Sequence, residues 1–131
     1  MISTKGRYGL RVMIDLAEHQ QEGCVPLKEI AARQEISKKY LEIIVRELVS
    51  ANLIEGLSGK GGGYRLTRPA ADYTAGEILE AMEQTLVPVA CLKLGAELCP
   101  RKENCKTLPL WTEYSEMVHN FFYGKKLTDL L

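Results

Sequence analysis

The hydrophobic positions of the chain fall into five stretches with helical spacing and two short stretches of strand character. Apolar residues recur every three or four positions over residues 4–19, 27–34, 37–48, 74–83 and 107–124, which predicts amphipathic helices. Residues 53–57 and 64–67 flank a loop with four glycines in six positions, which predicts a β-hairpin. We therefore expect a mainly α-helical protein with one small hairpin.

The helix expected over residues 37–48 divides into an apolar face and a polar face. The apolar stripe, with the spacing i, i+3, i+4 and i+7, consists of Leu41, Ile44, Val45 and Leu48. The opposite face, flanked by Lys38 and Tyr40, carries Lys39, Glu42, Ile43 and Arg46. Ser37 is a good N-cap, and a helix start beside two lysines suits phosphate. Side chains of the first turns suit base edges in a major groove. The alternative is an ordinary amphipathic surface helix.

The surroundings of this helix predict a helix-turn-helix. A short helix starts near Pro26, and Glu35 and Ile36 make a tight connection to Ser37, as in helix-turn-helix proteins or in a plain αα-hairpin. The hairpin that follows, with Lys60 at its tip, has the composition of a wing that contacts phosphate or a minor groove. A nucleotide-binding P-loop is excluded, because a strand follows the glycines instead of Lys-Ser/Thr opening a helix.

The rest of the chain suggests three regions. We expect a winged helix-turn-helix domain over residues 1–83, a cysteine-containing sensor loop over 84–106, and a C-terminal dimerisation helix and tail over 107–131. Thr107 can cap the last helix, whose apolar stripe contains the only Trp and both Phe of the chain. The alternative for this helix is packing on its own core.

Composition narrows the class of protein. The chain has 131 residues, 46% of them hydrophobic and 26% charged, which is ordinary for a globular protein. It has no apolar run long enough to span a membrane, and we expect it in the cytoplasm. The net charge is zero, but residues 1–68 contain 11 Lys and Arg against 8 Asp and Glu, and residues 69–131 contain 6 against 9. The positive half thus carries the candidate recognition helix.

Four cysteines suggest metal or redox chemistry. Cys91, Cys99 and Cys105 fall within fifteen positions, whereas Cys24 lies apart in a connecting loop and is interpreted as a bystander. In a reducing compartment such crowding favours a metal or thiol-redox site over a disulfide framework. A thiol oxidoreductase is disfavoured because the chain has no Cys-x-x-Cys pair. We therefore expect no enzymatic activity.

An ordered set of short motifs spans the chain. In sequence order these are Thr4-Lys5-Gly6-Arg7-Tyr8, Ile36-Ser37, Tyr40-Leu41-Glu42, Gly61-Gly62-Gly63-Tyr64, Gly76-Glu77-Ile78, the three cysteines, and Leu110-Trp111. With them the chain resembles the Rrf-two family of bacterial winged-helix regulators. The resemblance implies a homodimeric repressor or activator that binds a pseudo-palindromic operator. It also implies an iron–sulfur cluster on Cys91, Cys99 and Cys105 whose state alters DNA affinity.

The sequence departs from the family pattern at the wing and at the cluster. Ser58 stands where family wings usually carry an arginine, with Lys60 as the nearby cation. Arg7 and Leu108 occupy the positions from which relatives supply a fourth cluster ligand, and seven residues separate Cys91 from Cys99 where five is common. A [2Fe-2S] or a [4Fe-4S] cluster, a zinc site completed by another ligand, and a thiol-oxidation switch all stay open.

These observations define the candidate site residues. Contacts to double-stranded operator DNA are expected from Lys5, Ser37, Lys38, Lys39, Tyr40, Glu42, Ile43, Arg46, Lys60, Gly61, Gly62 and Tyr64. Metal binding is expected from Cys91, Cys99 and Cys105. The alternative function is a cluster-free winged-helix regulator controlled by thiol oxidation or by a protein partner.

Overall fold

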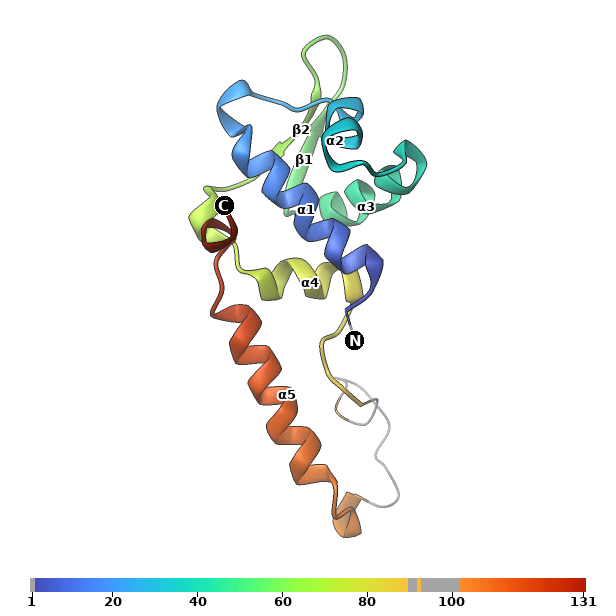
Figure 1. Ribbon diagram of the computed structural model, residues 1–131, viewed down its shortest axis with the longest axis vertical. Coiled ribbons are helices and arrows are strands. Elements are labelled where there is room, and N and C mark those ends of the chain that lie inside the picture. Colours follow the sequence, from blue (N-terminus) through green and yellow to red (C-terminus); the bar gives the residue numbers. More distant parts are fainter. Residues whose placement is uncertain (1, 90–91, 93–101) are drawn as a thin grey trace.

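The computed structural model describes residues 2–89, 92 and 102–131. Five helices and a two-stranded hairpin follow one another in the order shown in Figure 1: α1 (Thr4–Glu18), α2 (Leu27–Gln34), α3 (Lys38–Ser50), β1 (Ile54–Leu57), β2 (Gly63–Leu66), α4 (Ala75–Glu83) and α5 (Leu108–Tyr123). Short 3-10 turns lie at η1 (Gln20–Glu22), η2 (Ala70–Asp72), η4 (Lys102–Asn104) and η5 (Leu127–Leu130). The predicted winged helix-turn-helix fold is confirmed.

The core lies between α1, α2, α3 and α4. Leu41, Ile44 and Leu48 of α3 are completely buried there, and Val45 is almost so, which confirms the predicted apolar stripe. Helix α1 is buried over more than one face, because its glycines let α4 pack directly against it. The C-terminal turn η5 returns to this core: Leu127 is fully buried, and its N–H donates to the carbonyl of Tyr73 at 3.0 Å.

Side-chain caps fix the start of several helices. The hydroxyl of Ser37 accepts from the N–H of Tyr40 at 3.2 Å, and Thr74 and Glu77 form the predicted reciprocal capping box of α4. The prediction for Thr107 is wrong in part. Thr107 occupies the N-cap position of α5, but its side chain makes no capping hydrogen bond. Its backbone is already helical, with φ −95° and ψ −10°, whereas capping side chains act from an extended residue.

The wing is anchored at its base on two sides. Strands β1 and β2 pair antiparallel from Ile54 opposite Leu66 to Leu57 opposite Gly63. Val25 adds a bridge to Tyr64, with N–H to O distances of 2.8 and 2.9 Å. Gly63 has φ +143°, and a Cβ there would lie 2.4 Å from the carbonyl oxygen of Val25. The close approach of these two backbones therefore requires glycine.

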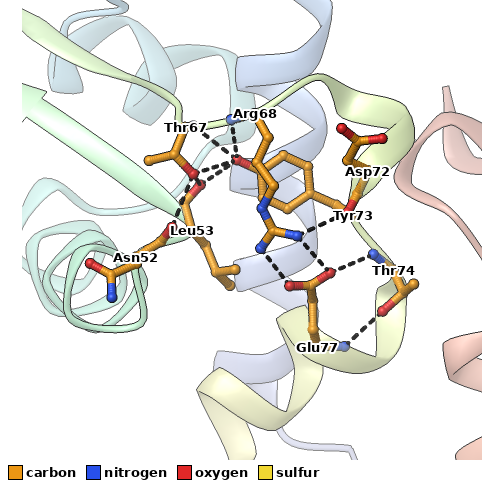
Figure 2. A network of polar contacts seen from close by, with 8 residues as sticks. All are labelled: Asn52, Leu53, Thr67, Arg68, Asp72, Tyr73, Thr74 and Glu77. Carbon is orange, nitrogen blue, oxygen red and sulfur yellow. Dashed lines mark hydrogen bonds and ion pairs between the residues drawn. The ribbon is translucent and has the colours of Figure 1, made fainter.

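A buried tyrosine ties the wing to α4 (Figure 2). The Tyr73 hydroxyl donates to the carbonyl of Leu53 at 2.7 Å and accepts from the N–H of Thr67 at 2.9 Å. Arg68 lies over the Tyr73 ring and pairs with Glu77 of the α4 capping box at 2.6 Å. The end of the hairpin and the start of α4 thus share one hydrogen-bond network.

Helix α5 leaves this compact part and extends away from it (Figure 1). It contacts α4 through Tyr123, whose ring packs on Gly76 so closely that a Cβ there would lie 2.3 Å from the ring. Burial raises the pKa of Tyr123 to about 12, and a hydrogen bond to Glu80 adds to the shift. No helix among the described residues is long and apolar enough to cross a membrane.

Candidate nucleic-acid interface and cysteine segment

The outward face of α3 is charged and exposed. Lys38, Lys39, Glu42 and Arg46 are all exposed, and the side chain of Ile43 is 41% exposed despite being apolar. They point outward because the four apolar residues of the same helix occupy the core. The predicted division of this helix into two faces is confirmed.

Tyr40 is the exception on this helix, because it is only half-exposed. Its ring meets that of Tyr8 on α1 edge-on, with centroids 5.7 Å apart, and the guanidinium of Arg11 lies over the Tyr8 ring at 5.0 Å. The aromatic part of Tyr40 therefore helps to hold α3 on α1.

Lys5 is tied to α3 within the protein. Its Nζ lies 3.0 Å from Oε1 of Glu47, and both side chains are about one-third exposed. The sequence motif around Lys5 gives no sign of this pair, because 42 residues separate the partners.

The wing and α3 enclose a common groove of about 690 Å³. From α3 it is lined by Glu42, Arg46 and Val49, and from the wing by Leu57, Ser58 and Tyr64. Lys60 and Gly61 lie exposed at the wing tip, outside this groove. Gly62 has a structural role of its own, because a Cβ there would lie 2.2 Å from the carbonyl oxygen of Leu57. The fold thus brings Tyr64 next to the recognition face and sets Lys60 apart from it.

A buried charge that sequence reasoning missed orients α2. The carboxylate of Asp15 on α1 is 1% exposed and accepts hydrogen bonds from Arg33 at 2.8 and 3.0 Å and from Gln34 at 2.9 Å. Burial alone would raise the pKa of Asp15, but the bonds from Arg33 and Gln34 outweigh it and hold the pKa below its ordinary value. Its position among buried Val12, Leu16 and other apolar residues of α1 is the sequence signal for a paired charge.

Of the cysteines, Cys91 and Cys99 lie outside the described residues. Cys105 is half-buried between η4 and α5, and its Sγ lies 3.4 Å from the Thr107 hydroxyl. Cys24 precedes α2 at the wing end of the molecule, whereas the segment with Cys105 lies at the opposite end (Figure 1). Within the described part of the chain, no three His, Cys, Asp or Glu side chains gather to hold a metal ion.

Three other side chains bear on the question of a fourth ligand. Arg7 is exposed on α1 and donates to the Thr4 hydroxyl at 3.1 Å. Nδ1 of His19 lies 2.8 Å from the carbonyl oxygen of Asp15, and the ring of His119 stacks on that of Tyr123 at 4.3 Å. Both histidines therefore already have structural contacts.

Comparison with known proteins decides the family. The model of Rrf2, described as an iron-dependent transcriptional regulator, matches residues 2–131. The chain belongs to the Rrf2 (Rrf-two) family. It is 38% identical to a putative helix-turn-helix regulator, ORF2, of Azotobacter vinelandii, over 99% of this chain and 78% of the relative. It is 35% identical to the regulator IscR of Serratia proteamaculans, again over 99% and 78%.

Solved structures support the same assignment. CymR of B. subtilis, titled the global cysteine regulator, superposes with a TM-score of 0.79 at 36% identity, covering 99% of this chain and 95% of that one. T. potens IscR superposes with a TM-score of 0.74 at 32% identity, covering 99% and 85%. The chain is thus an Rrf2-family transcriptional regulator, and its relatives are regulators rather than enzymes.

Proposed function

We propose that this regulator binds a pseudo-palindromic operator in double-stranded DNA, with α3 in the major groove and the wing on the flanking backbone. The observation that carries the proposal is the exposed, charged face of α3 beside the wing. Lys38, Lys39 and Arg46 bind phosphates or guanine, Glu42 favours cytosine, and Ile43 meets a thymine methyl group.

The ends of this interface have separate roles. Ser37 presents the α3 N-terminus to a phosphate, and Tyr40 and Tyr64 supply hydroxyl groups. Lys60, Gly61 and Gly62 bring the wing tip close to the backbone or the minor groove. Lys5, held by Glu47, adds positive charge beside α3.

We further propose that the protein binds as a homodimer through α5. Leu110 is 57% exposed, Met117 64% and Phe121 58%, all on one helix in which no residue is buried. A contiguous apolar face of this kind marks an interaction surface. A two-fold dimer would match the two half-sites of a palindromic operator. Residues 107–131 are then the dimerisation element, 1–83 the DNA-binding domain and 84–106 the sensor between them.

The sensor, in this proposal, is an iron–sulfur cluster held by Cys91, Cys99 and Cys105, of the [2Fe-2S] or [4Fe-4S] type. Three thiolates suit iron and sulfide, which are soft partners, and the family description is iron-dependent. When bound, the cluster supplies redox chemistry that responds to oxidants or nitric oxide. Cys105 connects this chemistry to the start of α5.

A second candidate is a cluster-free regulator controlled by thiol oxidation or by a protein partner. The CymR structures favour it, because one of them, from Staphylococcus aureus, is titled an oxidised form and is 35% identical with a TM-score of 0.74. The same cysteines would then change DNA affinity by oxidation of their thiols.

The DNA-binding proposal is tested by selecting genomic fragments and then measuring operator affinity against salt. Lys38→Ala and Lys39→Ala should each weaken binding and lower the slope of log K against log salt by about 0.9, the value for one phosphate contact. Lys125→Ala, which removes an exposed charge beside α5, should leave the slope unchanged. Unaltered slopes in both α3 variants would remove this helix from the interface.

The cluster is tested by iron and acid-labile sulfide content and a visible spectrum on protein purified without oxygen. Equal iron and sulfide, lost in Cys91→Ala, Cys99→Ala or Cys105→Ala and retained in Cys24→Ala, is the expected result. Iron-free protein that cannot be reconstituted would overturn the cluster. Affinity that then changes on thiol oxidation would establish the second candidate.

A further inference from the structure

The last residue of α4 is bonded to the first turn of α1. Oε1 of Glu83 accepts from the backbone N–H of Ser3 at 2.8 Å and from its hydroxyl at 2.6 Å. The same hydroxyl caps α1 by accepting from the N–H of Gly6 at 3.1 Å. One carboxylate therefore fixes both the entry of the chain into α1 and the side chain that caps it.

Two glycines bring α1 and α4 into direct contact at this point. A Cβ on Gly6 would lie 2.2 Å from Oε1 of Glu83, and a Cβ on Gly9 would lie 2.6 Å from Cγ of Met82. No long side chain separates the two backbones here, so a shift at the end of α4 is passed to α1 with little loss. Figure 1 shows the N-terminus beside the end of α4.

The same turn of α1 also reaches the recognition helix. Lys5 stands between Ser3 and Gly6 in sequence and pairs with Glu47 of α3 at 3.0 Å. The second oxygen of Glu47 is buried and accepts no hydrogen bond from any described residue. The Lys5 ammonium is therefore the main charge that compensates this carboxylate, and its loss would leave a buried oxygen on α3 without a partner.

Glu83 is also where the cysteine segment begins. Helix α4 ends there, with Gln84 at φ +70°, and the chain runs on as Thr85, Leu86, Val87 and Pro88. These residues face α5 across a groove of about 570 Å³, and Ile2 and Glu83 line the same groove. The connector thus has space to move, and any movement of it acts first on Glu83.

We propose that Glu83 is a latch that couples the cysteine segment to the recognition helix through the first turn of α1. In the latched state, seen here, Glu83 holds Ser3, and Lys5 holds Glu47. A change of state at the cysteines displaces the connector and withdraws Glu83, so that the first turn of α1 frays and Lys5 leaves Glu47. The latched state binds the operator more tightly. This inference rests on the proposed DNA-binding and sensing function.

The first test is hydrogen–deuterium exchange on the full-length protein without DNA. Glu83→Gln keeps the shape of the side chain and removes its charge. It should speed exchange in the first turn of α1 and also in the segment of α3 around Glu47. Glu18→Gln, at the exposed end of α1, should change neither. Faster exchange confined to α1, or no change, would overturn the latch whether or not the protein binds DNA.

The second test is operator affinity in the two cysteine states, with the cluster loaded or removed, or with the thiols oxidised or reduced. The wild type should show a ratio of affinities, and Glu83→Gln should reduce that ratio by about threefold to tenfold. It should do so by weakening the tighter-binding form. An unchanged ratio in the variant would overturn the latch, whereas a wild type with no ratio would overturn the sensing function instead.

A double-mutant cycle tests the route through Lys5. Glu47→Gln removes the charge that Lys5 pairs with, on the opposite side of the proposed route. If the latch acts through this pair, the double variant Glu83→Gln/Glu47→Gln should reduce the ratio no further than either single change. Effects that multiply would show that the two contacts act independently and would overturn the proposed route.

Discussion

Helices α3 and α5 are both amphipathic, but they use their apolar faces differently. In α3, Leu41, Ile44 and Leu48 are completely buried in the core of their own chain. In α5, Met117 and Phe121 are more than half exposed, and no residue of the helix is buried. Periodicity alone therefore identifies a face that needs covering, and it does not say which molecule covers it.

The difference arises from the surroundings of each helix. Helix α3 packs against α1, α2 and α4, which enclose its stripe from three directions. Helix α5 touches α4 at one end, where Tyr123 lies on Gly76, and then extends away from the compact part (Figure 1). A charge placed on each stripe should therefore have different consequences, on assembly in one helix and on folding in the other.

The largest effect is expected from Met117→Asp on α5. If two copies pair through this face, a two-fold interface receives two unpaired carboxylates. Burying them should weaken dimerisation by roughly a thousandfold, or about 4 kcal/mol. Sedimentation equilibrium measures the dissociation constant. The thermal stability of the monomer should hardly change, because Met117 is 64% exposed in the single chain.

A matched control is Glu116→Gln, an exposed neighbour on the same helix, which should leave the dissociation constant close to that of the wild type. A Met117→Asp protein that remains a dimer would remove this face from the interface. A monomeric wild type would remove α5 as a dimerisation helix altogether.

The next largest effect is expected from Leu48→Ala on α3. Leu48 is fully buried, and the cavity left by such a change costs about 3 kcal/mol of folding free energy. Urea denaturation should show it as a lower midpoint with little change in slope. The dimerisation constant, measured well below the transition, should stay the same. A loss below about 1 kcal/mol would contradict the packing described for this core.

Much of the fold follows from local sequence signals. Ser37 and the Thr74–Glu77 pair mark helix starts, and the apolar spacing marks α3, so these elements could be predicted from neighbouring residues alone. The Lys5–Glu47 and Ser3–Glu83 contacts could not, because they join residues 42 and 80 positions apart. Such partners become neighbours only through the packing of α1 on α3 and α4, which local periodicity does not encode.

Asp15→Asn should have a smaller effect on folding, with a dependence on pH. At neutral pH it removes the charge that Arg33 and Gln34 bind, and we expect a loss of about 2 kcal/mol. Because folding holds the pKa of Asp15 below its ordinary value of 3.8, its contribution is complete above that value and is lost as the pH falls through the folded pKa.

The gap in unfolding free energy between the wild type and Asp15→Asn should therefore narrow between about pH 5 and pH 2. Urea titrations at several pH values measure it. Asp72→Asn, at an exposed position in η2, serves as a control and should run parallel to the wild type. A gap that stays constant down to pH 2 would show that Asp15 is not stabilised as a carboxylate.

The smallest difference concerns the first residues of the two helices. The Ser37 side chain bonds the N–H of Tyr40 and starts α3, whereas Thr107 makes no capping bond at the start of α5. Ser37→Ala should therefore cost about 1 kcal/mol, and Thr107→Ala should cost less than about 0.5 kcal/mol, the usual range for a surface change. Thermal denaturation of both variants tests the pair. Equal losses would mean that Thr107 caps α5 in solution, as its sequence position alone predicts, and that the start of α5 is as firmly fixed as that of α3.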